Sequence, residues 1–257
     1  MDPLNAPGMN PAEFDNIARA ERDFWWFRGM RDILFAMLDP LARAQSIQQV
    51  LEAGCGTGYM SKVLAARYGW RMTPLDLGWQ GLAYAREYGL QRLVQGDIAA
   101  LPFPDDRFDA VVSLDVIVHF PLGQEDRAMA ELSRVLRPGG LLILRASALN
   151  ILRSRHSQFA LERQRFTKKR LVALTRRHGI RILRVTYANS LLMPVALIKF
   201  RIWEPLTRQP PRSGVQPASP WLEHLLYAPL KMEAGCLRRG FDFPLGQSLI
   251  LLGQKET

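Results

Sequence analysis

The fold of this chain is decided by residues 51 to 58, which read LEAGCGTG. Residues 46 to 51 read as a short strand of β-branched and apolar side chains, and residues 59 to 68 place apolar groups at helical spacing. A strand, a glycine-rich turn and a helix therefore follow one another. Glycine lets a backbone adopt positive φ and approach a ligand closely, and the first N–H groups of the helix point toward that ligand.

The spacing of the three glycines separates two ligand classes. Dinucleotide-binding turns favour G-x-G-x-x-G, whereas here the glycines fall at 54, 56 and 58 and Tyr59 follows. This argues against an NAD-dependent oxidoreductase. Asp76 lies 18 residues after Gly58, at the end of the next predicted strand. A carboxylate there can accept hydrogen bonds from both ribose hydroxyls of an adenosine.

Strand and helix patterns alternate along the chain. The nearly continuous apolar run FDAVVSL is typical of a central strand that is buried on both faces. The alternation predicts an α/β fold with a doubly wound, mostly parallel sheet. The predicted strands are residues 46–51, 70–75, 91–95, 108–114, 141–145, 180–187 and 248–252, and the predicted helices are residues 10–22, 29–38, 59–68, 78–88, 124–136 and 167–178.

Four further motifs follow the glycine turn in order: GDI at 96–98, LPF at 101–103, FDAV at 108–111 and RVLRPGG at 134–140. With the turn, they resemble the class I S-adenosylmethionine (SAM)-dependent methyltransferases, and most closely the small-molecule enzymes of the ubiquinone/menaquinone-biosynthesis type. The resemblance spans about residues 46 to 146 and is weak from 188 onward. It implies a seven-stranded Rossmann-like methyltransferase fold, SAM as cofactor and S-adenosyl-L-homocysteine (SAH) as product.

The resemblance also assigns roles to residues. Asp97 would meet the adenine amino group, between the apolar neighbours Leu77 and Ile98. The end of the fourth strand would lie at the methyl-donor end of the cofactor, where Asp115 either holds the methionine amino group or only caps the helix after it. The predicted cofactor-binding residues are Glu52, Gly54, Cys55, Gly56, Gly58, Asp76, Leu77, Asp97, Ile98, Ser113, Asp115 and Arg28.

An aromatic cluster, FWWFRG at residues 24–29, lies between the two leading predicted helices. Aromatic side chains bury large areas, so this cluster can fasten those helices to the core. Leading segments of this fold also often fold over the cofactor, where Arg28 would meet a carboxylate. The two interpretations are compatible. The motif WWFRG in addition resembles a bacterial subgroup of methyltransferases.

His119 follows the fourth strand and is the candidate base, because the unperturbed pKa of histidine lies near neutrality. The alternative, which we favour, is that His119 packs or forms hydrogen bonds locally behind the strand end. The chain has neither a C-x-x-C pair nor a spaced histidine cluster, so we expect no metal site.

The net charge of +10 is concentrated in residues 150–184, which hold 11 Lys/Arg and a single acidic residue. This basic block could attract phosphates, an anionic membrane face or nucleic acid, or it could be a solvated face. Base-methylating enzymes carry an Asn/Asp-Pro-Pro-aromatic element or a Pro-Cys pair, and the chain has SLDV at the corresponding strand end. A nucleic-acid partner is therefore the less favoured interpretation, whereas peripheral membrane contact stays open.

Residues 188–246 hold eight of the 17 prolines and several apolar stretches. A hairpin would need only a few residues, so we expect a mostly helical lid inserted before the last strand. The expected division is an N-terminal helical cap (1–40), a SAM-binding core (41–187), the lid or substrate insertion (188–246) and the last core strand (247–257). The absence of a secretory signal pattern and the two cysteines favour a cytoplasmic protein.

The sequence thus predicts a SAM-dependent methyltransferase that acts on a small, partly apolar acceptor by direct displacement. Two alternatives stay open: an RNA or protein methyltransferase that uses the basic block, and a non-catalytic SAM-binding regulatory protein. The acceptor atom (O, N or C), the order of the lid without ligand and the oligomeric state are left open.

Overall fold

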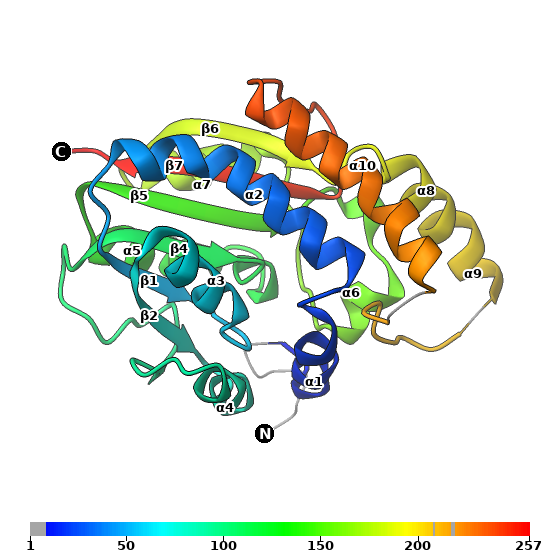
Figure 1. The fold of residues 1–257 in the computed structure, drawn as a ribbon, viewed down its shortest axis with the longest axis horizontal. Helices are drawn as coiled ribbons and strands as arrows, with labels where there is room; N and C mark the ends of the chain where they lie inside the picture. The colour runs from blue at the N-terminus through cyan, green and yellow to red at the C-terminus, as the bar shows by residue number, and fades with distance from the viewer. Residues whose placement is uncertain (1–8, 208, 217–218) are drawn as a thin grey trace.

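The computed structural model describes residues 9–207, 209–216 and 219–257, in which seven strands form one sheet (Figure 1). The strand order is β3-β2-β1-β4-β5-β7-β6. The first five strands pair in parallel, and β7 lies antiparallel between β5 and β6. The predicted doubly wound, mostly parallel sheet is confirmed. The strands are β1 Gln49–Ala53, β2 Arg71–Asp76, β3 Val94–Gln95, β4 Phe108–Leu114, β5 Leu136–Ser147, β6 Ile180–Ala188 and β7 Ser248–Lys255.

Helices connect the strands and cover both faces of the sheet. They are α1 Pro11–Ala20, α2 Trp25–Ala44, α3 Tyr59–Tyr68, α4 Trp79–Glu87, α5 Glu125–Val135, α6 Arg155–Phe159, α7 Lys168–Arg177, α8 Met193–Ile198, η3 Lys199–Trp203 (π-helical), α9 Glu204–Thr207 and α10 Pro220–Arg238, with single 3₁₀ turns at η1 Ile117–His119 and η2 Asn150–Leu152. None of the helices in the described ranges is long and apolar enough to cross a bilayer.

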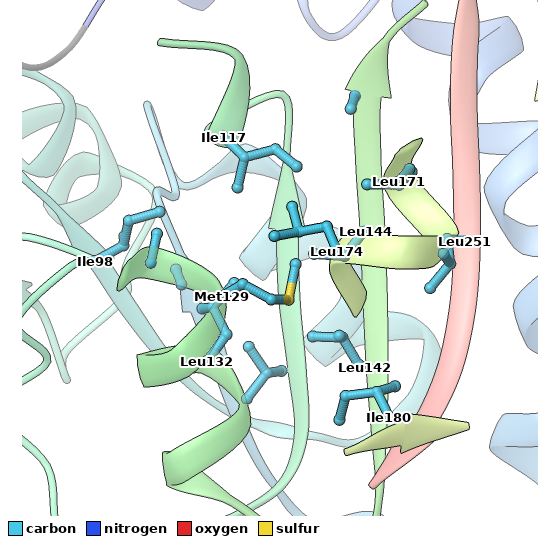
Figure 2. Close-up of a cluster of buried hydrophobic side chains, with 14 of the residues drawn as sticks. Ile98, Ile117, Met129, Leu132, Leu142, Leu144, Leu171, Leu174, Ile180 and Leu251 are labelled. Atoms are coloured by element: carbon cyan, nitrogen blue, oxygen red, sulfur yellow. The ribbon is translucent and has the colours of Figure 1, made fainter. Parts of the chain in front are cut away.

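Alternate side chains of the central strands feed two hydrophobic layers, as the period of two in a strand requires. Leu142 and Leu144 of β5 point toward α5 and α7, where Figure 2 shows them beside Met129, Leu132 and Leu174. Their neighbours Leu141 and Ile143 point to the opposite face, which α2, α3 and α10 cover. The sheet is therefore buried on both sides, as the continuous apolar strands predicted.

Some element boundaries differ from the predicted ones. The aromatic cluster is not a linker between two helices: Phe24 is the N-cap of α2, and the following residues form its first turn. The RPGG turn does not precede the fifth strand, because β5 already begins at Leu136, which pairs with Phe108. Residues 137–140 form an irregularity within the strand, since the next pair is Ala110 with Leu141.

The insertion between β6 and β7 contains α8, η3, α9 and α10, and its proline-rich tip falls partly on residues outside the described ranges. Helix α10 runs along α2 (Figure 1) and buries Leu230, Ala234 and Leu237 in the core. This helix is therefore a structural layer of the core as well as part of the insertion. The expected cap boundary at residue 40 also lies inside a helix, α2.

Candidate active site

A cavity of about 1080 Å³ opens beyond the carboxyl ends of the parallel strands. Its walls come from the glycine turn after β1, from the ends of β2 and β4, from α1, and from η3 and the start of α9. The strand order reverses between β1 and β4, and ligands of open α/β sheets bind at such a switch point. The topology thus places the cavity where a ligand site is expected.

The glycine turn has the conformation that its sequence predicted. Gly54, Gly56 and Gly58 all have positive φ, between 55° and 82°. The N–H groups of Gly54 and Cys55 donate to the carbonyl of Leu75, at 2.8 and 2.9 Å, which fastens the turn to β2. The turn therefore presents its backbone to the cavity in a fixed position.

Asp76 joins the glycine turn to the loop after β2. Its Oδ2 accepts a hydrogen bond from the N–H of Gly56 and its Oδ1 accepts one from the N–H of Gly78, both at 2.8 Å. Burial raises the pKa of this carboxyl to about 6, against the opposing effect of the two backbone hydrogen bonds. Each carboxylate oxygen can accept a second hydrogen bond, so Asp76 keeps capacity for a pair of hydroxyl donors from a ligand.

Most of the other predicted residues of the adenosine end also line the cavity, among them Leu77, Asp97 and Ile98. The Oδ1 of Asp97 accepts a hydrogen bond from the N–H of Ala99 at 2.8 Å, which fixes the orientation of that carboxylate. Cys55 is buried against the cavity, and burial raises the pKa of its thiol well above the usual range. This cysteine therefore stays protonated at neutral pH and is not a nucleophile.

Two of the predicted residues, Gly58 and Ser113, lie outside the cavity lining. A Cβ on Gly58 would lie 2.6 Å from Cβ of Ala85, so this glycine permits close packing of the turn on α4. The hydroxyl of Ser113 donates to the carbonyl of Ala53 at 2.9 Å and links β4 to β1. Both residues stabilise the backbone that supports the site.

Arg28, the predicted partner of a cofactor carboxylate, is likewise absent from the lining, and its guanidinium lies 4.2 Å from the ring centre of Tyr227. Arg31, one helical turn later, lines the cavity instead. Its guanidinium donates to the carbonyls of Glu21 and Arg22. Because Arg28 and Arg31 are three residues apart on α2, the aromatic motif alone could not distinguish which of them faces the site.

Glu52 lies buried beneath the glycine turn and lines the cavity. It accepts a hydrogen bond from the hydroxyl of Ser61. Burial raises the pKa of Glu52 to about 8, against that hydrogen bond and with smaller contributions from Asp76 and Glu21. Glu52 is therefore protonated at neutral pH in the folded chain.

This raised pKa makes folding stability depend on pH. Since the folded state holds the proton more tightly than the unfolded state, the stabilisation is complete below the unfolded pKa of 4.5 and is lost as the pH rises through about 8. In Glu52→Gln this loss is absent. The free energy of unfolding of the wild type should therefore fall, relative to that of the variant, by about 2 kcal/mol, or roughly 4 to 8 °C in Tm, between pH 6 and 9. Thermal unfolding across this pH range tests the prediction. As a control, substitution of the exposed Glu87 in Glu87→Gln should give a plot of Tm against pH that is parallel to that of the wild type. A parallel plot for Glu52→Gln would contradict the prediction.

The N-terminal segment closes over the adenosine end through Glu21. This buried carboxylate accepts hydrogen bonds from the hydroxyls of Thr57 at 2.5 Å and Tyr88 at 2.9 Å, and it lines the cavity. Phe14 of α1 is also in the lining and lies against Gly78 and Gly81. No sequence pattern indicated Glu21, because its partners lie on the glycine turn and at the C-cap of α4 and reach it only through the fold.

At the other end of the cavity, Asp115 forms an ion pair with Arg145, with Nε 2.7 Å from Oδ2. Asp115 has φ of 59°, and its Oδ1 is buried and without a hydrogen-bond partner among the described residues. Arg145 in turn lies 5.1 Å from the ring centre of Trp26. Strained backbone and an unpartnered buried oxygen are typical of binding sites. Arg145 was not predicted, although the carboxyl ends of β4 and β5 must meet at this edge.

His119 lines the cavity, and its Nδ1 lies 3.3 Å from the carbonyl of Leu161. Because a carbonyl can only accept, this contact requires the proton on Nδ1, which leaves the lone pair of the neutral ring on Nε2. Burial lowers the pKa of His119, so the ring is neutral at pH 7. A second histidine in the lining, His156, accepts a hydrogen bond from the N–H of Gly214 at 3.1 Å. Within the described ranges, no group of three or more His, Cys, Asp and Glu side chains could hold a metal ion.

Comparison with known proteins gives the family. The family model described as a methyltransferase domain matches residues 51–144, which run from the glycine turn to β5. The chain is 42% identical over 103 residues to malonyl-[acyl-carrier protein] O-methyltransferase of Pectobacterium atrosepticum, covering 40% of each protein. It is 37% identical over 101 residues to 2-methyl-6-phytyl-1,4-hydroquinone methyltransferase of Synechocystis, covering 37% of this chain and 30% of that one. The aligned part is thus less than half the length of these relatives.

Solved structures extend the likeness of the fold to nearly the whole chain. Phosphoethanolamine N-methyltransferase 2 of Haemonchus contortus, in complex with phosphomonomethylethanolamine and SAH, matches 96% of this chain and 58% of its own with a TM-score of 0.58 and 16% identity. The [4+2]-cyclase SpnF matches 86% of this chain and 81% of its own with a TM-score of 0.53 and 20% identity. At such identities the likeness establishes the fold alone.

The glycine turn, the carboxylate that ends β2 and the matched methyltransferase domain agree with one another. The predicted family is therefore confirmed, whereas the finer likeness to ubiquinone/menaquinone enzymes stays a prediction. Residues 51–144 therefore form a methyltransferase domain of the class I SAM-dependent family, whose cofactor is SAM.

Proposed function

We propose that this chain transfers a methyl group from SAM to a small, partly apolar acceptor by direct displacement. The observation that carries the proposal is the composition of the cavity. One end is formed by the glycine turn and carboxylates suited to a nucleoside. The rest of the lining combines aromatic and apolar side chains, among them Trp26, Phe200, Trp203 and Leu226, with charged ones such as Arg145, Arg155 and Lys199. A donor and an acceptor can therefore lie in one enclosed space.

The residues present fit SAM at the end formed by the glycine turn. Both oxygens of Asp76 are held by backbone N–H groups and retain capacity for ribose hydroxyls. Asp97 and Ile98 lie in the same wall and suit the polar edge and the flat face of adenine. The unpartnered Oδ1 of Asp115 can accept a hydrogen bond from an ammonium group, as the methionine end of the cofactor would offer.

SAM supplies a methyl group that its sulfonium sulfur has already activated. The chain has mainly to orient the acceptor and to exclude water, and orientation of this kind can lower a barrier by about 7 to 11 kcal/mol in favourable models. The ion pair of Asp115 with Arg145 fixes the positions of these two side chains in the cavity wall. His119, neutral and with its lone pair on Nε2, is the proposed base for an acceptor that must lose a proton.

A small-molecule acceptor is favoured over RNA or protein. The names of the relatives above describe methylation of a malonyl group and of a phytyl-hydroquinone. Four of the 11 cations of the basic block form ion pairs within the fold: Arg165 pairs with Glu162, Arg170 with Glu125, Arg177 with Asp126 and Arg184 with Asp242. Cations that are held in this way contribute little to a phosphate-binding surface.

A non-catalytic or differently catalytic role is the second candidate, since the cyclase SpnF shares this fold. A turnover assay distinguishes methyl transfer from this second candidate role. The purified chain is incubated with SAM and panels of carboxylic acids, phenols, quinols and amines that carry apolar groups, and SAH is quantified by mass spectrometry. We expect SAH formation that depends on the acceptor. Tight SAH binding with no turnover on any panel would favour the non-catalytic role.

The same assay tests His119. If His119 removes a proton from the acceptor, His119→Ala lowers kcat by about 10²- to 10⁴-fold and removes the acidic limb of the pH profile. SAH affinity should stay near the wild-type value, because the proposed base acts on the acceptor. An unchanged kcat would assign His119 to local packing against Leu161.

A further inference from the structure

We infer that the outer face of the insertion helices docks on an anionic lipid bilayer, with the mouth of the cavity beside the membrane. The helical segment α8–η3–α9 and the turn that leads into it carry an exposed apolar row, which we call the lid stripe: Leu191, Val195, Ile198, Ile202 and Leu206. Their exposed fractions run from 45% for Leu191 to 74% for Leu206.

The spacing of the lid stripe is that of one helix face. Successive members are four, three, four and four residues apart, which keeps them on a single side of a helix. In a soluble helix this row normally faces the core. Here the inward side is formed by Leu192 and Ala196, which are buried, so the lid stripe is a second apolar face that the described chain leaves uncovered.

Helix α10 repeats the arrangement. Its inward side buries Leu230, Ala234 and Leu237. Its outward side presents Trp221, Leu225, Ala228 and Met232, again at helical spacing and all exposed. Exposed apolar patches of this extent mark interaction surfaces rather than ordinary solvent-facing helices.

The charges of the insertion are sorted by sign. The acidic groups accept backbone hydrogen bonds within the fold. Glu204 accepts from the N–H of Arg155, Glu223 from the N–H of Trp25, and buried Glu233 from the N–H groups of Ser190 and Leu191, within the insertion itself. The cations Lys199, Arg201, Lys231 and Arg238 are exposed. Apolar rows flanked by exposed cations suit a bilayer whose head groups are negative.

This arrangement favours a bilayer over a second copy of the chain. Two such faces in contact would bring like charges together, and like charges at an interface disfavour association. Trp203 of η3 and Trp221 in the outward row of α10 have exposed fractions of 65% and 67%, and tryptophan is enriched where apolar and aqueous phases meet.

The lid stripe borders the cavity. Lys199 and Trp203, which lie on η3 between members of the lid stripe, are exposed and also line the cavity. A lipid-dissolved acceptor could therefore enter from the bilayer without crossing water. This last step rests on the proposed function; the docking itself does not.

The test measures binding of the full chain to vesicles of phosphatidylcholine with about one quarter phosphatidylglycerol, by co-sedimentation and tryptophan fluorescence. We expect the wild type to bind these vesicles, more weakly at high salt, and the triple variant Ile198→Ser, Ile202→Ser, Leu206→Ser to lose at least about tenfold in partition coefficient. The matched control is Leu122→Ser, an equally exposed leucine (76%) outside the insertion, which should bind like the wild type.

SAH affinity measured on each variant reports folding and separates this inference from the proposed function. Loss of vesicle binding with normal SAH affinity supports docking through the lid stripe. Equal binding by the triple variant and the wild type, or no binding by either, overturns it. A dimer in light scattering that the triple variant abolishes would assign the face to a second copy and would also overturn it.

Discussion

Asp76→Asn lowers the affinity for SAH by about 100-fold, or roughly 3 kcal/mol, measured by isothermal titration calorimetry. The substitution keeps the shape of the side chain but replaces one acceptor oxygen with an N–H₂ donor. That donor then faces the N–H of Gly56 or of Gly78, which both donate to Asp76 in the folded chain. The glycine turn loses its anchor, and a ribose hydroxyl loses a charged acceptor.

Asp109→Asn is the matched control. The Oδ2 of Asp109 accepts hydrogen bonds from the N–H groups of Gln48 and Gln49, at 3.0 and 2.8 Å, so this carboxylate also fastens backbone. It does so at the opposite end of the sheet, near the start of β4. SAH affinity should stay within about twofold of wild type, because distant sites act independently. Equal affinities for the two variants would disprove a ligand role for Asp76.

Gly81→Ala is expected to displace the glycine turn. A Cβ at position 81 would lie 2.3 Å from the carbonyl oxygen of Gly56 and 2.7 Å from Cε1 of Phe14. The backbone of the turn cannot rotate away as the tip of a side chain could. We expect a loss of about 2 kcal/mol in the free energy of unfolding, and a fall of at least about tenfold in SAH affinity.

Gly235→Ala provides the comparison. Gly235 lies within α10, and the nearest atom to its added Cβ would be a guanidinium nitrogen of Arg239 at 3.7 Å. With space for the methyl group, alanine should stabilise the helix by up to about 1 kcal/mol and leave SAH binding unchanged. Chemical denaturation and calorimetry on both variants test the pair. Normal SAH affinity in Gly81→Ala would show that the turn tolerates the shift.

The core of the fold could be predicted because its signals are local. The apolar run of β4 and the glycines after β1 each specify their own backbone within a few residues. The start of α2 could not be predicted in this way. Its N-cap, Phe24, has no side-chain hydrogen bond, and the helix begins because its aromatic first turns pack on the core. The irregularity in β5 was missed for a similar reason, since the pairing of Leu136 with Phe108 is a tertiary contact.

The residues of the candidate site likewise fall into two groups, those that local sequence signals predict and those that tertiary packing brings to the site. Glu52, Asp76 and Asp97 lie at or near the carboxyl ends of strands whose order the sequence indicates, and the structure places all three in the cavity wall. Glu21 and Arg31 reach the cavity from the leading helices, whose position relative to the sheet depends on packing. No spacing rule relates such residues to the glycine turn, because the distance between them along the chain carries no geometric information.

The position of β7 has a consequence for biosynthesis. This strand pairs with β5 on one side and β6 on the other, although about 60 residues separate it from β6 along the chain. During translation, β5 and β6 leave the ribosome with open hydrogen-bonding edges, and the apolar insertion follows before their shared partner exists. The nascent polypeptide therefore carries two aggregation-prone edges until β7 is made, and a chaperone that shields exposed strands would have its longest opportunity to act in that interval.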